Sequence, residues 1–234
     1  MRNLFGERRA LIGGFGLAAA AGAIVMPSDA NARPEGLKWM PVFEPQDAWL
    51  DKPGTRHRLV FDATTAPAVE SAMFYADTYY EANKSGYSLP PEALGVVIVL
   101  RHFATPFGYN DKVWFKYGAG FADKLKLQGD RAIRAARMNP LLSAKARLPG
   151  KEKNDGDDVV TLATLAAKGA QFGVCGVATR GVAEQLAKAS GAAASTIEAE
   201  LKANLVPGAT LAAAGIVAIN RAQEHGYSFV YIAD

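Results

Sequence analysis

The stretch ALGVVIVLRHF, residues 93–103, contains an uninterrupted run of Val, Ile and Leu, and a polar pair, Arg101-His102, follows this run. Such a run is typical of a strand covered on both faces, as in a parallel sheet. A shorter apolar run at 58–62 precedes it. Between the two, residues 66–86 have apolar side chains at helical spacing, a proline near the start and a glycine at the end, which predicts a helix.

The same alternation returns in the C-terminal half of the chain. We expect a helix at 158–168, with Asp157 as its cap. Further strands are expected at 171–178, 210–214 and 227–233, and further helices at 180–190, 195–205 and 215–226. Strands that alternate with helices of this length indicate right-handed βαβ units. The sequence therefore predicts the α/β class, as a three-layer α/β/α sandwich with a mainly parallel sheet of about five strands.

The first 32 residues have the three parts of an export signal: a basic start, an apolar middle and a small-residue cleavage site, Ala30-Asn31-Ala32. The pair Arg8-Arg9 ahead of a mildly apolar segment resembles the twin-arginine signal, which a receptor reads. The apolar segment is shorter than the ~18–20 residues that span a bilayer. We therefore expect cleavage, a periplasmic location and no membrane attachment afterwards.

The mature chain carries little net charge. Of the 26 basic and 23 acidic residues, three and two fall in the signal, which leaves a net charge of +2. This balance argues against nucleic acid as a partner. Residues 33–56 hold four prolines and no sustained period, so we expect an extended N-terminal arm before a domain at 57–234. Three aromatic residues of the arm are expected to pack against the domain: Trp39, Phe43 and Trp49.

Residues 104–156 show no strand signal and are interpreted as an insertion with 11 basic and 5 acidic residues. One hypothesis makes it a lid over a ligand cavity; the other makes its aromatic residues core and its basic run a solvated face. In the lid hypothesis, the residues that line the cavity are Phe107, Tyr109, Trp114, Phe115 and Tyr117, and those that attract an anion are Arg131, Arg134 and Arg137. Because the aromatic residues of the arm and the insertion exceed what a small domain must bury, we also expect a homo-oligomer.

Cys175 is the only cysteine, so an intrachain disulfide is impossible. A lone cysteine in an exported protein is either intermolecular or reactive, or it simply packs in the core. Its expected place is in the third strand or at the carboxyl end of that strand, and parallel sheets bind ligands beyond the carboxyl ends of their strands. The N-terminus of the following helix stabilises a thiolate. Gly173 and Gly176 allow another backbone to come close.

Arg101 and His102 point toward the same edge if the sheet is parallel. Arg101 is a candidate binding residue, and His102 is a candidate general base for Cys175 because imidazole titrates near neutral pH. His57 and His225 are expected to be structural or exposed. Three scattered histidines and one cysteine do not form a metal site by spacing, and no residue pattern identifies a cofactor.

The segment KGAQFGVCGVATRGVAEQLA (168–187) resembles the cysteine motif of the DsrE/DsrF-like sulfur-relay family. The ending VPGATLAAAGIVAINRAQEHGYSFVYI (206–232) is similar to the family's closing strand, helix and strand. The opening strand and helix at 58–86 and the Val-rich second strand fit the same order of elements. The resemblance implies a five-stranded α/β fold, small oligomers, and a cysteine that receives sulfur as a persulfide and passes it on.

Only Cys175 takes that role here, with a sulfur donor or acceptor protein as partner. Arg180, expected in the first turn of the next helix, either stabilises the anionic sulfur or is solvated or ion-paired. Three hypotheses follow. The chain is a periplasmic persulfide carrier, or a non-catalytic oligomeric binding module whose basic insertion holds a small anion or partner protein, or a sulfurtransferase that turns over a small donor.

Overall fold

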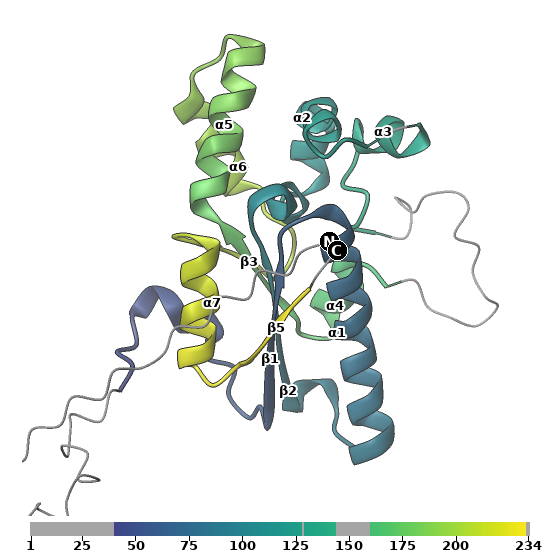
Figure 1. Cartoon of the computed structure of the whole chain (residues 1–234), viewed down its shortest axis with the longest axis vertical. Helices are drawn as coiled ribbons and strands as arrows, with labels where there is room; N and C mark the ends of the chain where they lie inside the picture. Colours follow the sequence, from purple (N-terminus) through teal and green to yellow (C-terminus); the bar gives the residue numbers. More distant parts are fainter. Residues whose placement is uncertain (1–39, 128, 144–159, 233–234) are drawn as a thin grey trace, which may run out of the picture. The chain divides into compact units, whose positions relative to one another are not determined.

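A parallel sheet forms the centre of the fold (Figure 1). The computed structural model describes residues 40–127, 129–143 and 160–232. Within them, five strands pair in the order β4-β3-β2-β1-β5, and every pair is parallel. The strands are β1 His57–Ala63, β2 Leu94–Leu100, β3 Gln171–Cys175, β4 Ala209–Ala212 and β5 Ser228–Tyr231. The prediction of a three-layer α/β/α sandwich is confirmed.

The helices connect these strands as the alternating pattern requires. They are α1 Ala66–Tyr87, α2 Asp111–Lys124, α3 Asp130–Ala135, α4 Leu162–Ala167, α5 Gly176–Ser190, α6 Ala194–Ala203 and α7 Gly215–Glu224. Three short 3-10 helices accompany them: η1 Pro45–Leu50, η2 Pro91–Ala93 and η3 His102–Gly108. None of the helices in this described part of the chain has the length and apolar character to span a membrane.

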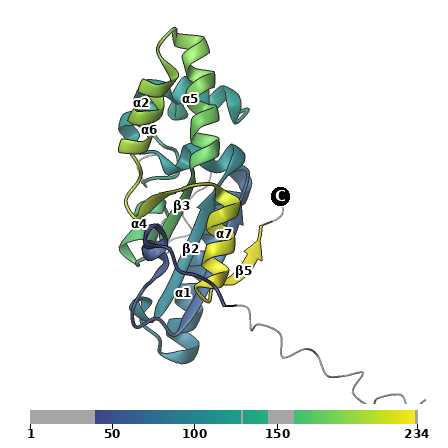
Figure 2. The same ribbon diagram turned by 90° about the vertical axis from the view of Figure 1, so that its left-hand side faces the viewer.

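The sheet is covered on both faces because alternate side chains of each strand point to opposite sides. On one face, Phe61, Ile98 and Phe172 join the large core with residues of α1, α4, α5 and α6. On the other, Val60 and Val99 pack with residues of α7 and with Leu50 of η1. Figures 1 and 2 show α7 and α1 on opposite sides of the sheet.

The connections change face at one point in the sheet. From β1 to β4 the chain crosses the sheet in order, and the helices of these connections join the core on the α1 side. From β4 it returns to the far edge through α7 on the other face. The helices that leave the neighbouring strands β3 and β4 therefore lie on opposite faces, which is where open α/β sheets bind ligands.

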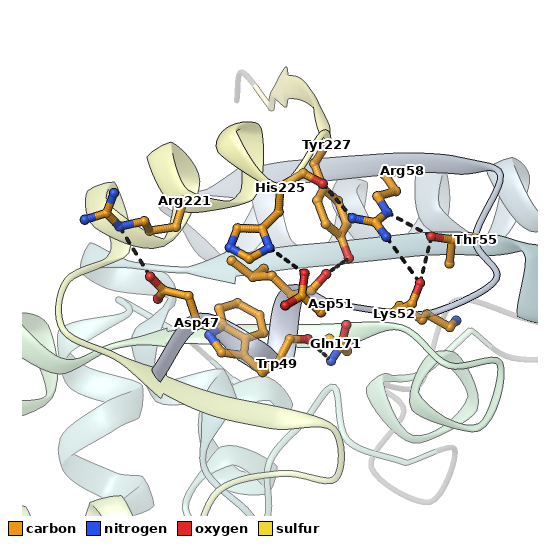
Figure 3. A network of polar contacts seen from close by, with 11 residues as sticks. Asp47, Trp49, Asp51, Lys52, Thr55, Arg58, Gln171, Arg221, His225 and Tyr227 are labelled. Atoms are coloured by element: carbon orange, nitrogen blue, oxygen red, sulfur yellow. Dashed lines mark hydrogen bonds and ion pairs between the residues drawn. The ribbon is translucent and has the colours of Figure 1, made fainter. Parts of the chain in front are cut away.

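The arm is more regular than expected. Residues 45–50 form the 3-10 helix η1, and the side chain of Leu50 is fully buried. Polar contacts hold this segment against the sheet and α7 (Figure 3). Asp47 pairs with Arg221 at 3.3 Å, the Lys52 ammonium donates to the Leu94 carbonyl at 2.9 Å, and Gln171 donates to the Trp49 carbonyl. The arm thus completes the layer that α7 alone forms only in part.

Two of the aromatic residues expected to anchor the arm do contact the domain. Trp49 packs against the core beneath α7. The ring of Phe43 contacts the ring of His225, and their centroids are 4.4 Å apart. Trp39 lies outside the described residues. His225 takes the structural alternative: its ring is buried, and Nδ1 lies 2.7 Å from the Asp51 carboxylate. His57 is exposed.

Several element boundaries differ from the expected ones. The second strand ends at Leu100 rather than residue 103, because the chain turns into η3 at His102. The third strand ends at Cys175 rather than 178, and α5 begins at Gly176. A capping box of Thr161 and Thr164 starts α4, and Asp157 lies outside the described residues.

Candidate functional site

Cys175 ends β3 and is the N-cap residue of α5. The Ala178 backbone N–H donates a hydrogen bond to its Sγ at 3.4 Å. A Ser, Thr, Asp or Asn oxygen usually takes this position at a helix start. The partial positive charge at the N-terminus of this 15-residue helix is therefore directed at a sulfur atom. The residue is 6% exposed.

A buried chain of hydroxyl groups fixes the backbone of Cys175. Thr179 donates its hydroxyl to the Cys175 carbonyl at 2.9 Å, as threonines inside helices often do. Tyr109 donates in turn to the Thr179 hydroxyl, also at 2.9 Å. Burial raises the pKa of Tyr109, so its hydroxyl stays protonated and remains a donor at neutral pH. The segment after β2 is thereby tied to the cysteine.

The strand register places Arg101 beside Cys175. Leu100 of β2 pairs with Val174 of β3, so the next residues on the two neighbouring strands are Arg101 and Cys175. Alternation along the strands turns both toward the α7 face, because Val99 and Gly173 contact residues on that side. The sheet register therefore sets Arg101 and Cys175 side by side on neighbouring strands.

Asp62 on β1 holds this guanidinium. The Nε of Arg101 donates to Oδ1 of Asp62 and Nη2 donates to Oδ2, both at 2.7 Å. These hydrogen bonds raise the pKa of Arg101 above its usual value, and the charge of Asp62 adds to the increase. Asp62 is 2% exposed, whereas the Arg101 side chain is 29% exposed. The pair thus reaches from the interior to the surface of the domain.

Two helix starts meet at this edge of the sheet. Ala212, the last residue of β4, pairs with Cys175. A Cβ on Gly176 would lie 2.7 Å from the Ala212 carbonyl oxygen, and a Cβ on Gly215 would lie 2.4 Å from Cβ of Arg101. Only glycine permits approaches this close. The N-termini of α5 and α7 therefore lie close to the ends of β3 and β4.

His102 and Arg180 have other surroundings. His102 is exposed, and its ring packs against Phe103 with 4.2 Å between centroids. No hydrogen bond joins it to Cys175 among the contacts of the described residues. Its φ of 57° lies in the left-handed region, which is uncommon for a residue with a Cβ. A role for His102 as general base therefore has no geometric support.

Arg180 takes the ion-paired alternative. Because α5 begins at Gly176, Arg180 lies in the second turn rather than the first. Its guanidinium is 65% exposed and lies 3.9 Å from the carboxylate of Glu198 on α6. Of the three residues proposed to assist the cysteine, the structure brings only Arg101 to it.

The aromatic residues of the insertion form core rather than a cavity. Phe107, Tyr109 and Trp114 are buried within the large core on the α1 side, which corrects the lid hypothesis at these positions. Tyr117 donates its hydroxyl to Glu200 of α6 at 2.7 Å, and Phe115 is exposed. Of the three arginines, Arg137 is exposed, and the side chains of Arg131 and Arg134 are not described.

Asp62 is the site residue that sequence reasoning missed. It stands in the run LVFDA, where a single acidic residue follows three apolar ones at the carboxyl end of a strand. Its alternation with Val60 assigns it to the α7 face, and a charge buried on a sheet face needs a partner. These two signals together would have directed attention to Arg101 on the next strand.

Among the described residues, no group of three or more His, Cys, Asp or Glu side chains is placed to hold a metal ion. The chain matches no family model, no curated protein and no solved structure. Its function must therefore be argued from the geometry of the site.

Proposed function

We propose that this protein carries sulfane sulfur as a persulfide on Cys175. The observation that carries the proposal is the placement of Sγ, which accepts the Ala178 N–H at the start of α5, with Arg101 at the matching position after the neighbouring strand. Helix N-termini and arginine side chains both stabilise anionic sulfur. The carboxyl ends of β3 and β4 are also the position at which sheets of this type bind ligands.

The chemistry requires no cofactor. The Cys175 thiolate attacks the outer sulfur of a donor such as thiosulfate, and a bond forms between Sγ and that sulfur. The sulfur–sulfur bond of the donor breaks, and its electron pair leaves with sulfite. A persulfide is a reversible modification, so a second thiolate can take the sulfur and regenerate Cys175. Neither step needs an external oxidant or reductant.

The proposal includes a location and an assembly. The twin-arginine pair Arg8-Arg9 supports export to the periplasm. Large apolar side chains exposed on the described surface support a homo-oligomer, in which a second copy covers them. In the arm and the insertion these include Phe43 and Phe115, and elsewhere they include Phe74, Phe229 and Tyr231.

A binding module with a packed cysteine is the alternative, and the low exposure of Cys175 favours it. Intact mass spectrometry separates the two. The mature protein is incubated with polysulfide or thiosulfate, beside a Cys175→Ala control. We expect a mass gain of one sulfur atom that reductant reverses and that the control lacks. An unchanged mass in the folded wild-type protein would reject the carrier proposal.

A further inference from the structure

Asp62 is costly to bury and adds little stability. Of the acidic residues in the described part of the chain, it is the only buried one. It stands on the α7 face of β1, two residues after Val60, which packs in the core of that face. A buried ion pair seldom improves on apolar residues of similar size, because desolvation offsets the attraction. A contribution to stability therefore does not explain why the Asp62–Arg101 pair is present.

The ion pair with Asp62 fixes the orientation of the Arg101 guanidinium and occupies only one of its edges. Asp62 accepts from Nε and Nη2 of Arg101, whereas Nη1 makes no hydrogen bond to any residue that the structure describes. The stem of Arg101 lies against Gly215, where a larger residue would collide with it. The side chain thus has little freedom, yet it remains 29% exposed.

We propose that Asp62 is a positioning residue that holds Arg101 so that Nη1 donates to an anionic group at Cys175, and that the site therefore selects anionic donors over neutral ones. This inference rests on the proposed role of Cys175. Arginine recognises anionic oxygen and sulfur groups through directed N–H donors, and a guanidinium held by a carboxylate loses less freedom when it binds.

Paired alkylation reagents test this selectivity. Iodoacetate is an anion and iodoacetamide is its neutral analogue of similar size. The rate constant for iodoacetate divided by that for iodoacetamide at Cys175 therefore reports the charge preference of the site. A change in how easily reagents reach the thiol affects both rate constants and does not alter the ratio. We expect Arg101→Gln to lower the ratio about tenfold relative to wild type, as a lost charge contact of this kind implies. Arg101→Lys keeps the positive charge but lacks the paired N–H donors of the guanidinium, so it is expected to give an intermediate ratio.

Asp62→Asn distinguishes positioning from neutralisation. If Asp62 holds the guanidinium in place, the ratio falls toward that of Arg101→Gln. A ratio that rises instead would mean that Asp62 only neutralises Arg101, and would overturn its positioning role. The double variant Asp62→Asn/Arg101→Gln leaves no buried charge unpaired and is expected to match Arg101→Gln, which keeps the test valid if a single variant folds poorly.

Arg221→Gln is the matched control. It removes the same charge, but Arg221 pairs with Asp47 and Glu224 in the last turn of α7, whereas Cys175 lies near the first turn. We expect its ratio to stay within twofold of wild type. A folded wild-type protein that reacts with neither reagent would overturn the persulfide proposal and this inference together. Reaction with both reagents at one ratio in every variant would overturn only this inference.

Discussion

Replacing Trp114 with alanine is expected to lower the free energy of unfolding by about 4 kcal/mol, the usual cost of truncating a buried tryptophan. Trp114 is fully buried, and its indole N–H donates to the Pro106 carbonyl at 2.9 Å. Its ring packs against Phe107 and Phe121. The substitution therefore leaves a cavity and removes one of the two hydrogen bonds that the Pro106 carbonyl accepts. Urea denaturation followed by circular dichroism measures the loss.

The neighbouring residue provides the control for Trp114. Phe115 is 75% exposed on the same helix, so Phe115→Ala is expected to change stability by no more than about 0.5 kcal/mol. Equal, small losses at the two positions would contradict the core assignment. The aromatic residues of the insertion would then again be candidates for a ligand cavity.

Arg101→Gln is expected to destabilise the protein by about 3 kcal/mol, because it leaves the Asp62 carboxylate buried without its partner. Adding Asp62→Asn removes the unpaired charge, so the double variant is expected to recover most of the loss. The two substitutions are thus strongly non-additive, as expected for residues in direct contact. Chemical denaturation of the two single variants and the double variant measures this coupling.

Arg180→Gln is the control for this cycle. Arg180 is 65% exposed and 3.9 Å from Glu198, so its loss is expected to cost no more than about 0.5 kcal/mol. If Arg101→Gln cost equally little, Asp62 would have access to water in solution. The account of a buried and held guanidinium would then be wrong.

The fold was largely predictable because it depends on patterns within single elements. The uninterrupted apolar run at 94–100 and the spacing of apolar residues at 66–87 each indicate one type of structure on their own. Boundaries were less predictable where a run suits both types. Residues 176–178 read as the end of a strand, yet they begin α5. Short apolar runs do not distinguish the two by periodicity.

The site was predictable only in part because it depends on contacts between distant residues. The local pattern alone places Cys175 in the third strand or at its carboxyl end. The Arg101–Asp62 pair joins residues 39 apart and requires the register of β1 against β2. Arg180 was misplaced because the helix starts four residues earlier than expected, at Gly176, which turns this side chain toward α6.

The central claim is that Cys175 is a functional thiol rather than a core residue. The most direct measurement compares the rate at which a neutral thiol reagent modifies Cys175 in the native protein with the rate of global unfolding. The account predicts modification that is much faster than unfolding and that low denaturant concentrations leave unchanged. Modification only at the unfolding rate, rising with denaturant, would show a thiol that is reached only when the protein unfolds and would contradict the account.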